Sequence, residues 1–139
     1  MRPRSAYVFV DSSAWYALGN ARDKNHLAAK RFLDAGHRLL TTNFVIDETI
    51  TLVLVRKGYQ AAVDLGEQLW SEEQARIVWL SRADQRAAWQ LFKRYSDKEF
   101  SFTDCTSFVV MERLELTHAF AFDENFSQTG QFVCAPHRR

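Results

Sequence analysis

The segment YVFVDSSAWYAL, residues 7–18, joins an apolar run directly to a helical pattern. The run at 7–10 has the length and composition of a buried strand. It ends at Asp11, and Ser12 and Ser13 begin the helical pattern without an intervening loop. A carboxylate at such a junction either caps the helix or belongs to a site at which several strand ends meet. The choice between these roles depends on where the other acids of the chain fall.

Short apolar runs and helical patterns alternate along the rest of the chain. We expect strands at 7–10, 38–42, 75–80, 119–122 and 131–135, and helices at 12–18, 25–35, 43–57, 59–71, 82–95 and 103–114. This alternation indicates a mostly parallel sheet with helices on its faces. No repeat, low-complexity segment or linker interrupts the pattern. The prediction is therefore a single domain over residues 1–139, an α/β protein with a four- to five-stranded sheet in a three-layer α/β/α sandwich.

Cap and turn residues mark several of the predicted helix boundaries. Asn43 is the predicted N-cap of the third helix, and Thr103 precedes the sixth. Ser81 with Asp84 three residues later has the pattern of a capping box. Gly58 follows the third helix, where a residue that tolerates a positive φ commonly ends a helix.

The composition is that of a globular protein. Of the 139 residues, 47% are hydrophobic and 14% aromatic, with only 5 Gly and 2 Pro. No apolar run approaches the roughly 18 residues of a membrane span, and the N-terminal apolar run is too short for a signal peptide, so we expect a cytoplasmic protein without membrane contact. The formal net charge is +1, so any polyanion would have to bind a local basic patch. Cys105 and Cys134 form no CxxC pair, which argues against structural zinc.

Four acidic residues stand near junctions between predicted strands and helices. Asp11 directly follows the first strand, and Asp123 directly follows the fourth. Glu48 lies in the second turn of the helix after the second strand, and Asp104 lies in the first turn of the helix that leads back to the fourth. Strand ends and helix starts share one edge of a parallel sheet. We therefore expect the four side chains to lie close together.

Each acid alone also has an ordinary explanation, as a helix cap, a dipole partner, a solvated charge or a turn residue. The combination is harder to explain in this way. Two carboxylates about 4 Å apart repel by about 4 kcal/mol at an effective dielectric constant of about 20. Four of them together require protons or a bound cation, and ligands that are all oxygen favour Mg²⁺ or Mn²⁺ over zinc.

The motifs around these acids are VDSS at 10–13, TNFVIDE at 42–48, FTDC at 102–105 and FDENF at 122–126. In this order and spacing they resemble the motifs of PIN-domain ribonucleases, and in particular those of the VapC-like toxins of type II (VapBC) toxin–antitoxin systems. The resemblance extends over nearly the whole chain. It implies a PIN-domain fold with four active-site acids, namely Asp11, Glu48, Asp104 and Asp123.

The resemblance further implies an endoribonuclease that hydrolyses RNA phosphodiester bonds with Mg²⁺ or Mn²⁺. Asp11, Asp104 and Asp123 would bind the metal directly or through water, and Glu48 would complete the metal site by holding a water molecule or would act as the base. The implied partners are an RNA substrate, a cognate antitoxin protein and a second copy of the chain in a homodimer. The apolar segment ITLVLVRKGY, at 50–59, is a candidate protein-binding surface, although burial within the fold explains it equally well.

Three positions complicate the resemblance. Ala121 stands where the family often has Thr, and Asn125 stands where a further Asp is common. Asp47 competes with Glu48 for the second acidic position. Neighbouring residues on a helix point about 100° apart, so only one of the two can face the other acids, and the motif spacing favours Glu48.

A catalytically inactive PIN-like module that binds RNA or protein is the alternative hypothesis. Trp15 and Tyr16 could stack on bases, but packing of a helix on the sheet explains them as well. Ser12 and Thr103 could hydrogen-bond to the acids or cap helices. Several basic residues could steer phosphates or could simply be solvated: Arg22, Lys24, Lys30, Arg31, Arg138 and Arg139.

Overall fold

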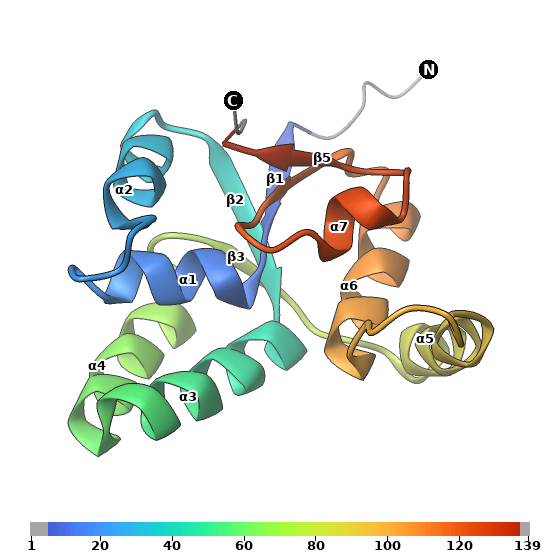
Figure 1. Ribbon diagram of the computed structural model, residues 1–139, viewed down its shortest axis with the longest axis horizontal. Helices are drawn as coiled ribbons and strands as arrows, with labels where there is room; N and C mark the ends of the chain where they lie inside the picture. Colours follow the sequence, from blue (N-terminus) through green and yellow to red (C-terminus); the bar gives the residue numbers. More distant parts are fainter. Residues whose placement is uncertain (1–5, 137–139) are drawn as a thin grey trace.

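The computed structural model describes residues 6–136 and contains a five-stranded parallel sheet between two layers of helices (Figure 1). The predicted three-layer α/β/α sandwich is confirmed. Along the chain the elements are β1 (Tyr7–Val10), α1 (Ser12–Gly19), α2 (His26–Asp34), β2 (Arg38–Thr42), α3 (Asn43–Lys57), α4 (Tyr59–Trp70), β3 (Arg76–Val78), α5 (Arg82–Arg94), α6 (Phe102–Arg113), β4 (His118–Phe120), α7 (Asn125–Gln128) and β5 (Val133–Ala135).

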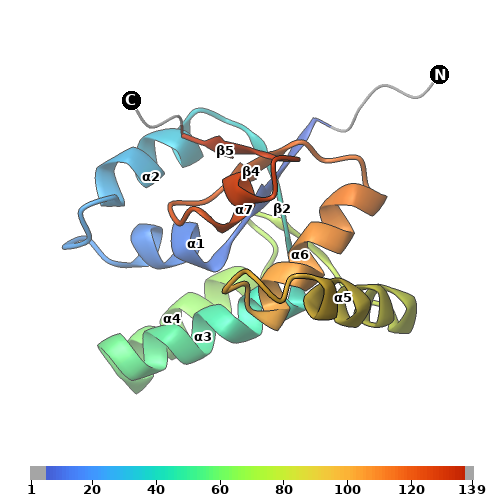
Figure 2. The same ribbon diagram turned by 45° about the vertical axis from the view of Figure 1, so that its right-hand side comes forward.

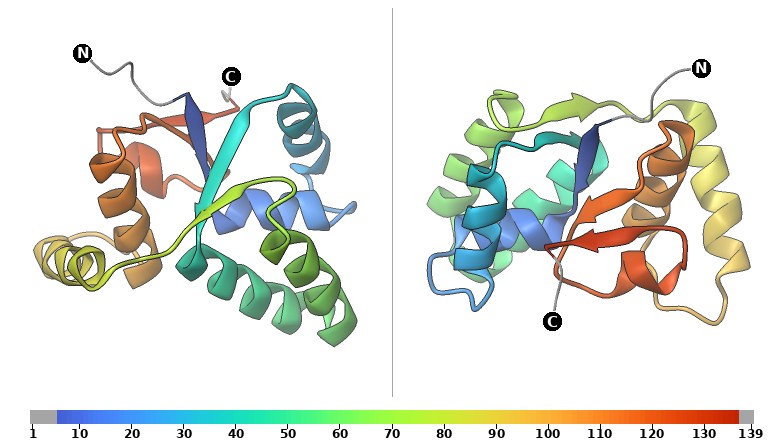
Figure 3. Two further views of the ribbon diagram at one scale, coloured as in Figure 1. Left: turned by 180° about the vertical axis from the view of Figure 1, so that it is seen from behind. Right: turned by 90° about the horizontal axis from the view of Figure 1, so that it is seen from above.

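The strand order, β3-β2-β1-β4-β5, makes β1 the central strand. The first connections move outwards from β1 to β3, and the later ones return past β1 to β5. Crossovers between parallel strands are right-handed, so connections that run in opposite directions lie on opposite faces of the sheet. Accordingly, α1–α4 cover one face and α5–α7 cover the other, as the view from above in Figure 3 shows. The carboxyl ends of β2, β1 and β4 therefore lie side by side.

The strands are shorter than predicted where the chain leaves the sheet to make other contacts. β3 ends at Val78 because the backbone N–H of Leu80 donates a hydrogen bond to the side chain of Asn43 (2.9 Å). β4 runs from His118 to Phe120, so it begins one residue before the predicted strand at 119–122 and ends two residues before that strand's predicted end. The four-residue helix α7 has no counterpart in the prediction, because so short a segment shows no periodicity.

Two predicted helix caps are wrong by one or two positions. The N-cap of α3 is Thr42, whose hydroxyl accepts a hydrogen bond from the N–H of Val45 (3.1 Å), because β2 passes into the helix without a loop. The N-cap of α6 is Ser101 rather than Thr103. The capping box at Ser81 is confirmed.

The core lies between the sheet and its two helical layers. Trp15 is completely buried, and its indole N–H donates a hydrogen bond to the hydroxyl of Thr41 (3.4 Å), so this residue packs α1 on the sheet and is unavailable to bases. On the other face, Phe126 packs between Phe9 and Phe108 and fixes the short helix α7.

No helix within residues 6–136 has the length and apolarity needed to cross a membrane. Arg138 and Arg139 lie outside the described residues.

An ion pair fastens α5 to α6. The guanidinium of Arg113 donates two hydrogen bonds of 2.9 Å, from Nε and Nη2, to the two carboxylate oxygens of Asp84. Asp84 is buried, which by itself would raise its pKa, but hydrogen bonds from Arg113 and Ser81 outweigh burial and lower the pKa. The side chain of Arg113 remains 46% exposed, so water screens part of the attraction.

We expect Arg113→Met to lower the free energy of unfolding by about 1–2 kcal/mol at neutral pH, because it leaves a buried carboxylate without its charged donor. The folded-state pKa of Asp84 is lowered, so the stabilisation is present above the unfolded-state pKa and is lost as the pH falls through the folded-state value. Urea unfolding at several pH values measures both effects. Arg31→Met, which removes an exposed arginine from α2, is the control and should have little effect.

Candidate active site

Asp11 lies where β1, α1 and β4 meet, and it is almost completely buried. Its backbone N–H donates a hydrogen bond to the carbonyl oxygen of Phe120 at the end of β4 (3.0 Å). Its Oδ2 accepts hydrogen bonds from the N–H and the hydroxyl of Ser13 (3.2 and 2.7 Å). The Ser13 hydroxyl also accepts a hydrogen bond from the N–H of Phe122 (3.0 Å). Asp11 is therefore the N-cap of α1, and Ser13 ties its carboxylate to the segment that leads to Asp123.

Asp104 lies in the first turn of α6 and is held by donors from two directions. In the capping box of this helix, the N–H of Ser101 donates to Asp104 Oδ2 (3.0 Å), and the Ser101 hydroxyl accepts from the N–H of Asp104 (3.0 Å). The side-chain amide of Asn125 donates a second hydrogen bond to the same Oδ2 (2.8 Å). These two donors hold Oδ2 in place, and Oδ1 accepts no hydrogen bond from within residues 6–136.

Asp123 follows β4 and is half-buried. Its Oδ1 accepts a hydrogen bond from the N–H of Asn125 (3.1 Å), which turns the chain into α7. Asn125 thereby contacts Asp123 through its backbone and Asp104 through its side chain. An Asp at position 125 would present an acceptor to Asp104 instead of a donor. The departure from the family pattern at this position therefore removes one negative charge and adds one hydrogen bond.

Glu48 is half-buried on α3, whereas its neighbour Asp47 is exposed to solvent. The Oε2 atom of Glu48 is buried and has no hydrogen-bond partner within residues 6–136. A buried carboxylate oxygen without a partner is costly, so an atom in this state indicates either a protonated carboxyl group or a position for a bound cation.

The charges of these acids act on one another. Burial raises the pKa of Asp11 well above its usual range, and the charges of Asp123 and Asp104 raise it further. The hydrogen bond from the Ser13 hydroxyl lowers this pKa but does not cancel the increase. Burial, with the charges of Asp104 and Asp123, raises the pKa of Glu48 to about 7, although hydrogen bonding from Thr103 lowers it. Burial and Asp123 also raise the pKa of Asp104, and its donors offset part of this increase. Asp104 and Asp123 thus lie within electrostatic reach of each other and of both Asp11 and Glu48.

Within residues 6–136, no three Asp, Glu, His or Cys side chains are arranged so that they could hold a metal ion as they stand. The donor set nevertheless fits a hard divalent cation in type and charge. All the candidate ligands are carboxylate oxygens, which Mg²⁺ and Mn²⁺ prefer. Glu48 Oε2 has no partner within residues 6–136, and a cation would oppose the burial and like charges that raise the pKa values of Asp11 and Glu48.

The sequence did not predict the contacts that Ser13 and Asn125 make at this site. The expected hydrogen-bond donor beside Asp11 was Ser12, but Ser13 makes both side-chain contacts. The signal for each lies in the spacing, because both stand two residues after an Asp, where a short polar side chain or N–H commonly meets the carboxylate. Thr103 does contact one of the acids, since hydrogen bonding from its side chain lowers the pKa of Glu48.

A family model described as "PIN domain" matches residues 8–131. The chain belongs to the PIN-domain family. It is 39% identical over 124 residues to the "23S rRNA-specific endonuclease VapC20" of Mycobacterium tuberculosis, which covers 88% of this chain and 94% of that protein. It is 28% identical over 126 residues to a "VapC ribonuclease" of Archaeoglobus fulgidus, which covers 86% of this chain and 79% of that one.

The fold agrees with this assignment. The crystal structure of Mycobacterium tuberculosis VapC20, described as a "Sarcin-Ricin loop cleaving toxin", matches with a TM-score of 0.85 and 38% identity, over 91% of this chain and 96% of that chain. The chain is accordingly a VapC-type endoribonuclease toxin of the PIN family. The resemblance drawn from the four short motifs is confirmed.

We expect the metal-free protein to lose stability as the pH rises from about 4.5 to about 7. The folded-state pKa of Glu48 is raised from 4.5 to about 7, so in this range the folded protein keeps a proton that the unfolded chain has released. Raising the pH therefore favours unfolding, and the raised pKa values of Asp11 and Asp104 act in the same direction. Urea unfolding in EDTA across this pH range measures the loss, and Glu48→Gln should make the dependence shallower. A stability that rises steadily through this range would contradict the repulsion among the acids.

Proposed function

We propose that this toxin cleaves RNA with Mg²⁺ or Mn²⁺ held by Asp11, Glu48, Asp104 and Asp123. The observation that carries the proposal is the buried, unpartnered Oε2 of Glu48 beside acids whose charges raise its pKa. Such a cluster is unfavourable without a cation and becomes favourable with one. We propose that residues 1–139 act as a single domain, in the cytoplasm, where RNA is available.

The residues of the site would have different roles in the reaction. A bound Mg²⁺ or Mn²⁺ supplies Lewis acidity, which offsets charge on the phosphate oxygens and lowers the pKa of water. Glu48, whose Oε2 atom has no hydrogen-bond partner within residues 6–136, would hold a water molecule in the cation site or accept the proton of the attacking water. Ser13 and Asn125 hold the carboxylates of Asp11 and Asp104 in fixed orientations, so that little reorganisation is needed when substrate binds.

We further propose that the substrate is 23S ribosomal RNA, by analogy with VapC20, with which this chain shares its fold and 39% identity. The alternative of an inactive PIN-like binding module is less favoured, because all four acids are retained and three of them have raised pKa values. A module that only binds RNA has no use for clustered carboxylates, which repel phosphate.

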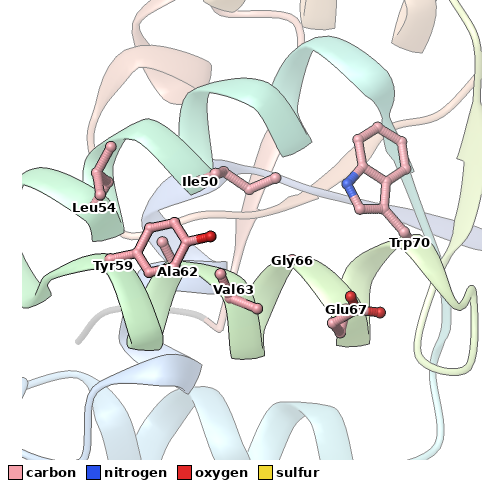
Figure 4. A pocket seen from close by; sticks show the side chains of 8 residues that line it. All are labelled: Ile50, Leu54, Tyr59, Ala62, Val63, Gly66, Glu67 and Trp70. Atoms are coloured by element: carbon pink, nitrogen blue, oxygen red, sulfur yellow. The ribbon is translucent and has the colours of Figure 1, made fainter.

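The proposed protein partners are a cognate antitoxin and a second copy of the chain. An apolar groove between α3 and α4 is lined by Ile50, Leu54, Tyr59, Ala62, Val63 and Trp70, and Figure 4 shows these side chains around it. Leu54 is 46% exposed and Tyr59 75% exposed, so the segment at 50–59 is not accounted for by burial within the fold. We assign this groove to an apolar segment of the antitoxin, and we propose the homodimer from the family alone.

We expect purified protein to cleave RNA with Mg²⁺ or Mn²⁺ and to stop in EDTA. Asp11→Asn and Asp104→Asn should each lower the rate at least about 100-fold, because each removes a charge that holds the cation. Gel analysis of ribosomal RNA fragments, with 23S RNA compared with 16S RNA, measures both activity and substrate choice.

Asp47→Asn is the matched control for Glu48→Gln, because it neutralises the adjacent carboxyl group on the same helix while that group faces solvent. We expect Asp47→Asn to retain activity and Glu48→Gln to lose it. Cleavage that survives EDTA, or that is equally sensitive to both substitutions, would overturn the proposed role of the acid cluster.

We expect Leu54→Asp to weaken capture of the co-expressed antitoxin at least about 10-fold while leaving RNA cleavage intact, because a buried charge is unfavourable at an apolar contact. Copurification followed by size-exclusion chromatography with light scattering measures capture and also the mass of the toxin alone. Val55→Asp is the control, since Val55 is exposed on the same helix but does not line the groove. A monomeric toxin, or unchanged capture by Leu54→Asp, would contradict the corresponding partner assignment.

A further inference from the structure

A cluster of four aromatic side chains extends from the surface of α5 to the acid site. Trp89 and Phe92 on α5 stack with their ring centroids 5.7 Å apart and their planes inclined by only 13°. Both rings meet Phe102 of α6 at centroid distances of 6.2 and 6.3 Å, and Phe102 in turn meets Phe44 of α3 at 6.2 Å. Figures 1 and 2 show α5 beside the first turn of α6.

The inner end of this cluster adjoins the acids. Phe102 lies two residues before Asp104 in the first turn of α6. Phe44 lies one helical turn before Glu48, and residues four apart share a face of a helix. An RNA strand that is bound with one phosphate at the acids therefore has its neighbouring nucleotides within reach of the aromatic rings.

The outer end of the cluster is open to solvent. Trp89 is 51% exposed and Phe92 is 38% exposed, although each is large and apolar. They are not needed to dock α5 on α6, since the inner stripe of α5 does this through buried Ala88 and the ion pair of Asp84 with Arg113. Exposed stacked aromatics beside a site point to an occupant of that surface.

The charge of α5 indicates what this occupant is. Exposed Arg82, Arg86 and Lys93 stand in one helical stripe with Trp89, at spacings of four, three and four residues, and Arg94 ends the helix. None of the four basic side chains pairs with a carboxylate within residues 6–136. A second copy of the chain would have to bury these charges against one another, whereas a polyanion would neutralise them. Basic residues that alternate with aromatic rings are the pattern by which proteins bind single-stranded nucleic acids.

We propose that Trp89 and Phe92, flanked by the basic residues of α5, form a stacking surface for unpaired bases of the RNA beside the scissile phosphate. This inference rests on the proposed ribonuclease function and adds a requirement to it. The RNA must be unpaired on the side that faces α5, because a paired base does not offer its face to a ring. The surface contributes affinity for the RNA and takes no part in the chemistry at the phosphate.

The test compares Trp89→Leu with Trp89→Tyr. Leu keeps an apolar side chain but has no ring face, whereas Tyr keeps a ring that can stack. The probe is a short single-stranded RNA oligonucleotide that the wild type cleaves, and its dissociation constant is measured by fluorescence anisotropy in the inactive Asp104→Asn background. Trp89→Leu should weaken binding about 5- to 100-fold, whereas Trp89→Tyr should retain most of the wild-type affinity.

A second series replaces single nucleotides of the probe by abasic residues on either side of the cleaved bond. At one or two positions an abasic residue should weaken binding to the protein that retains Trp89 and should have no further effect on Trp89→Leu. Trp79→Leu is the matched control, because Trp79 is a 64% exposed tryptophan that stacks on Trp70 (5.7 Å) and contacts none of the four rings. It should leave both series unchanged.

The outcomes are distinguishable. If the wild type cleaves no RNA, the proposed function fails first. The proposed stacking surface is wrong if the wild type cleaves RNA but Trp89→Leu binds the probe as tightly as the protein that retains Trp89. It is also wrong if abasic residues at all positions weaken binding to Trp89→Leu as much as to the protein that retains Trp89. A lower oligomeric mass of Trp89→Leu in sedimentation, without a base-dependent loss of affinity, would assign this face to contact between copies of the chain and would overturn the proposal.

Discussion

The central position of β1 is the constraint on which the rest of the structure depends. Because β2 and β4 both pair with β1 in parallel, three strand ends lie side by side at one edge of the sheet. Asp11 follows one of them, and α3, which carries Glu48, follows another without a loop. The return crossover brings the first turn of α6 to the same edge with Asp104. The site is thus a consequence of strand order and of right-handed crossovers more than of any local motif.

Packing maintains an arrangement that electrostatics opposes. Burial and like charges both disfavour the ionised forms of Asp11, Glu48 and Asp104. Hydrogen bonds at the N-cap of α1 and in the capping box of α6 hold the carboxylates of Asp11 and Asp104 and offset only part of this penalty. Phe126, buried between aromatic neighbours, fixes the helix that carries Asn125. The apolar core thereby holds in place a polar site that is unfavourable by itself.

Most of this arrangement follows from the sequence, because strand and helix periods are local and topology rules do the rest. The order of elements, the parallel sheet and the four junction acids all depend on patterns within a few residues. The cap of α3 is Thr42, and Asn43 instead accepts a hydrogen bond from Leu80, which is distant in sequence. Likewise, Asn125 reaches Asp104 across twenty-one positions, and the rings of α5 meet Phe102 only after two helices pack. Contacts of this kind have no local signal.

An acidic pocket and a negatively charged substrate pose opposite demands on the surface. Carboxylates that hold a cation repel RNA until the cation is bound, so affinity for the chain of phosphates has to come from elsewhere. The formal net charge of +1 cannot supply it, which leaves local patches. In α5, four exposed basic residues accompany a single acid, and that acid is already paired with Arg113. On the inference drawn above, the positive charge that attracts the phosphates comes from α5, whose aromatic rings lead back to the acids.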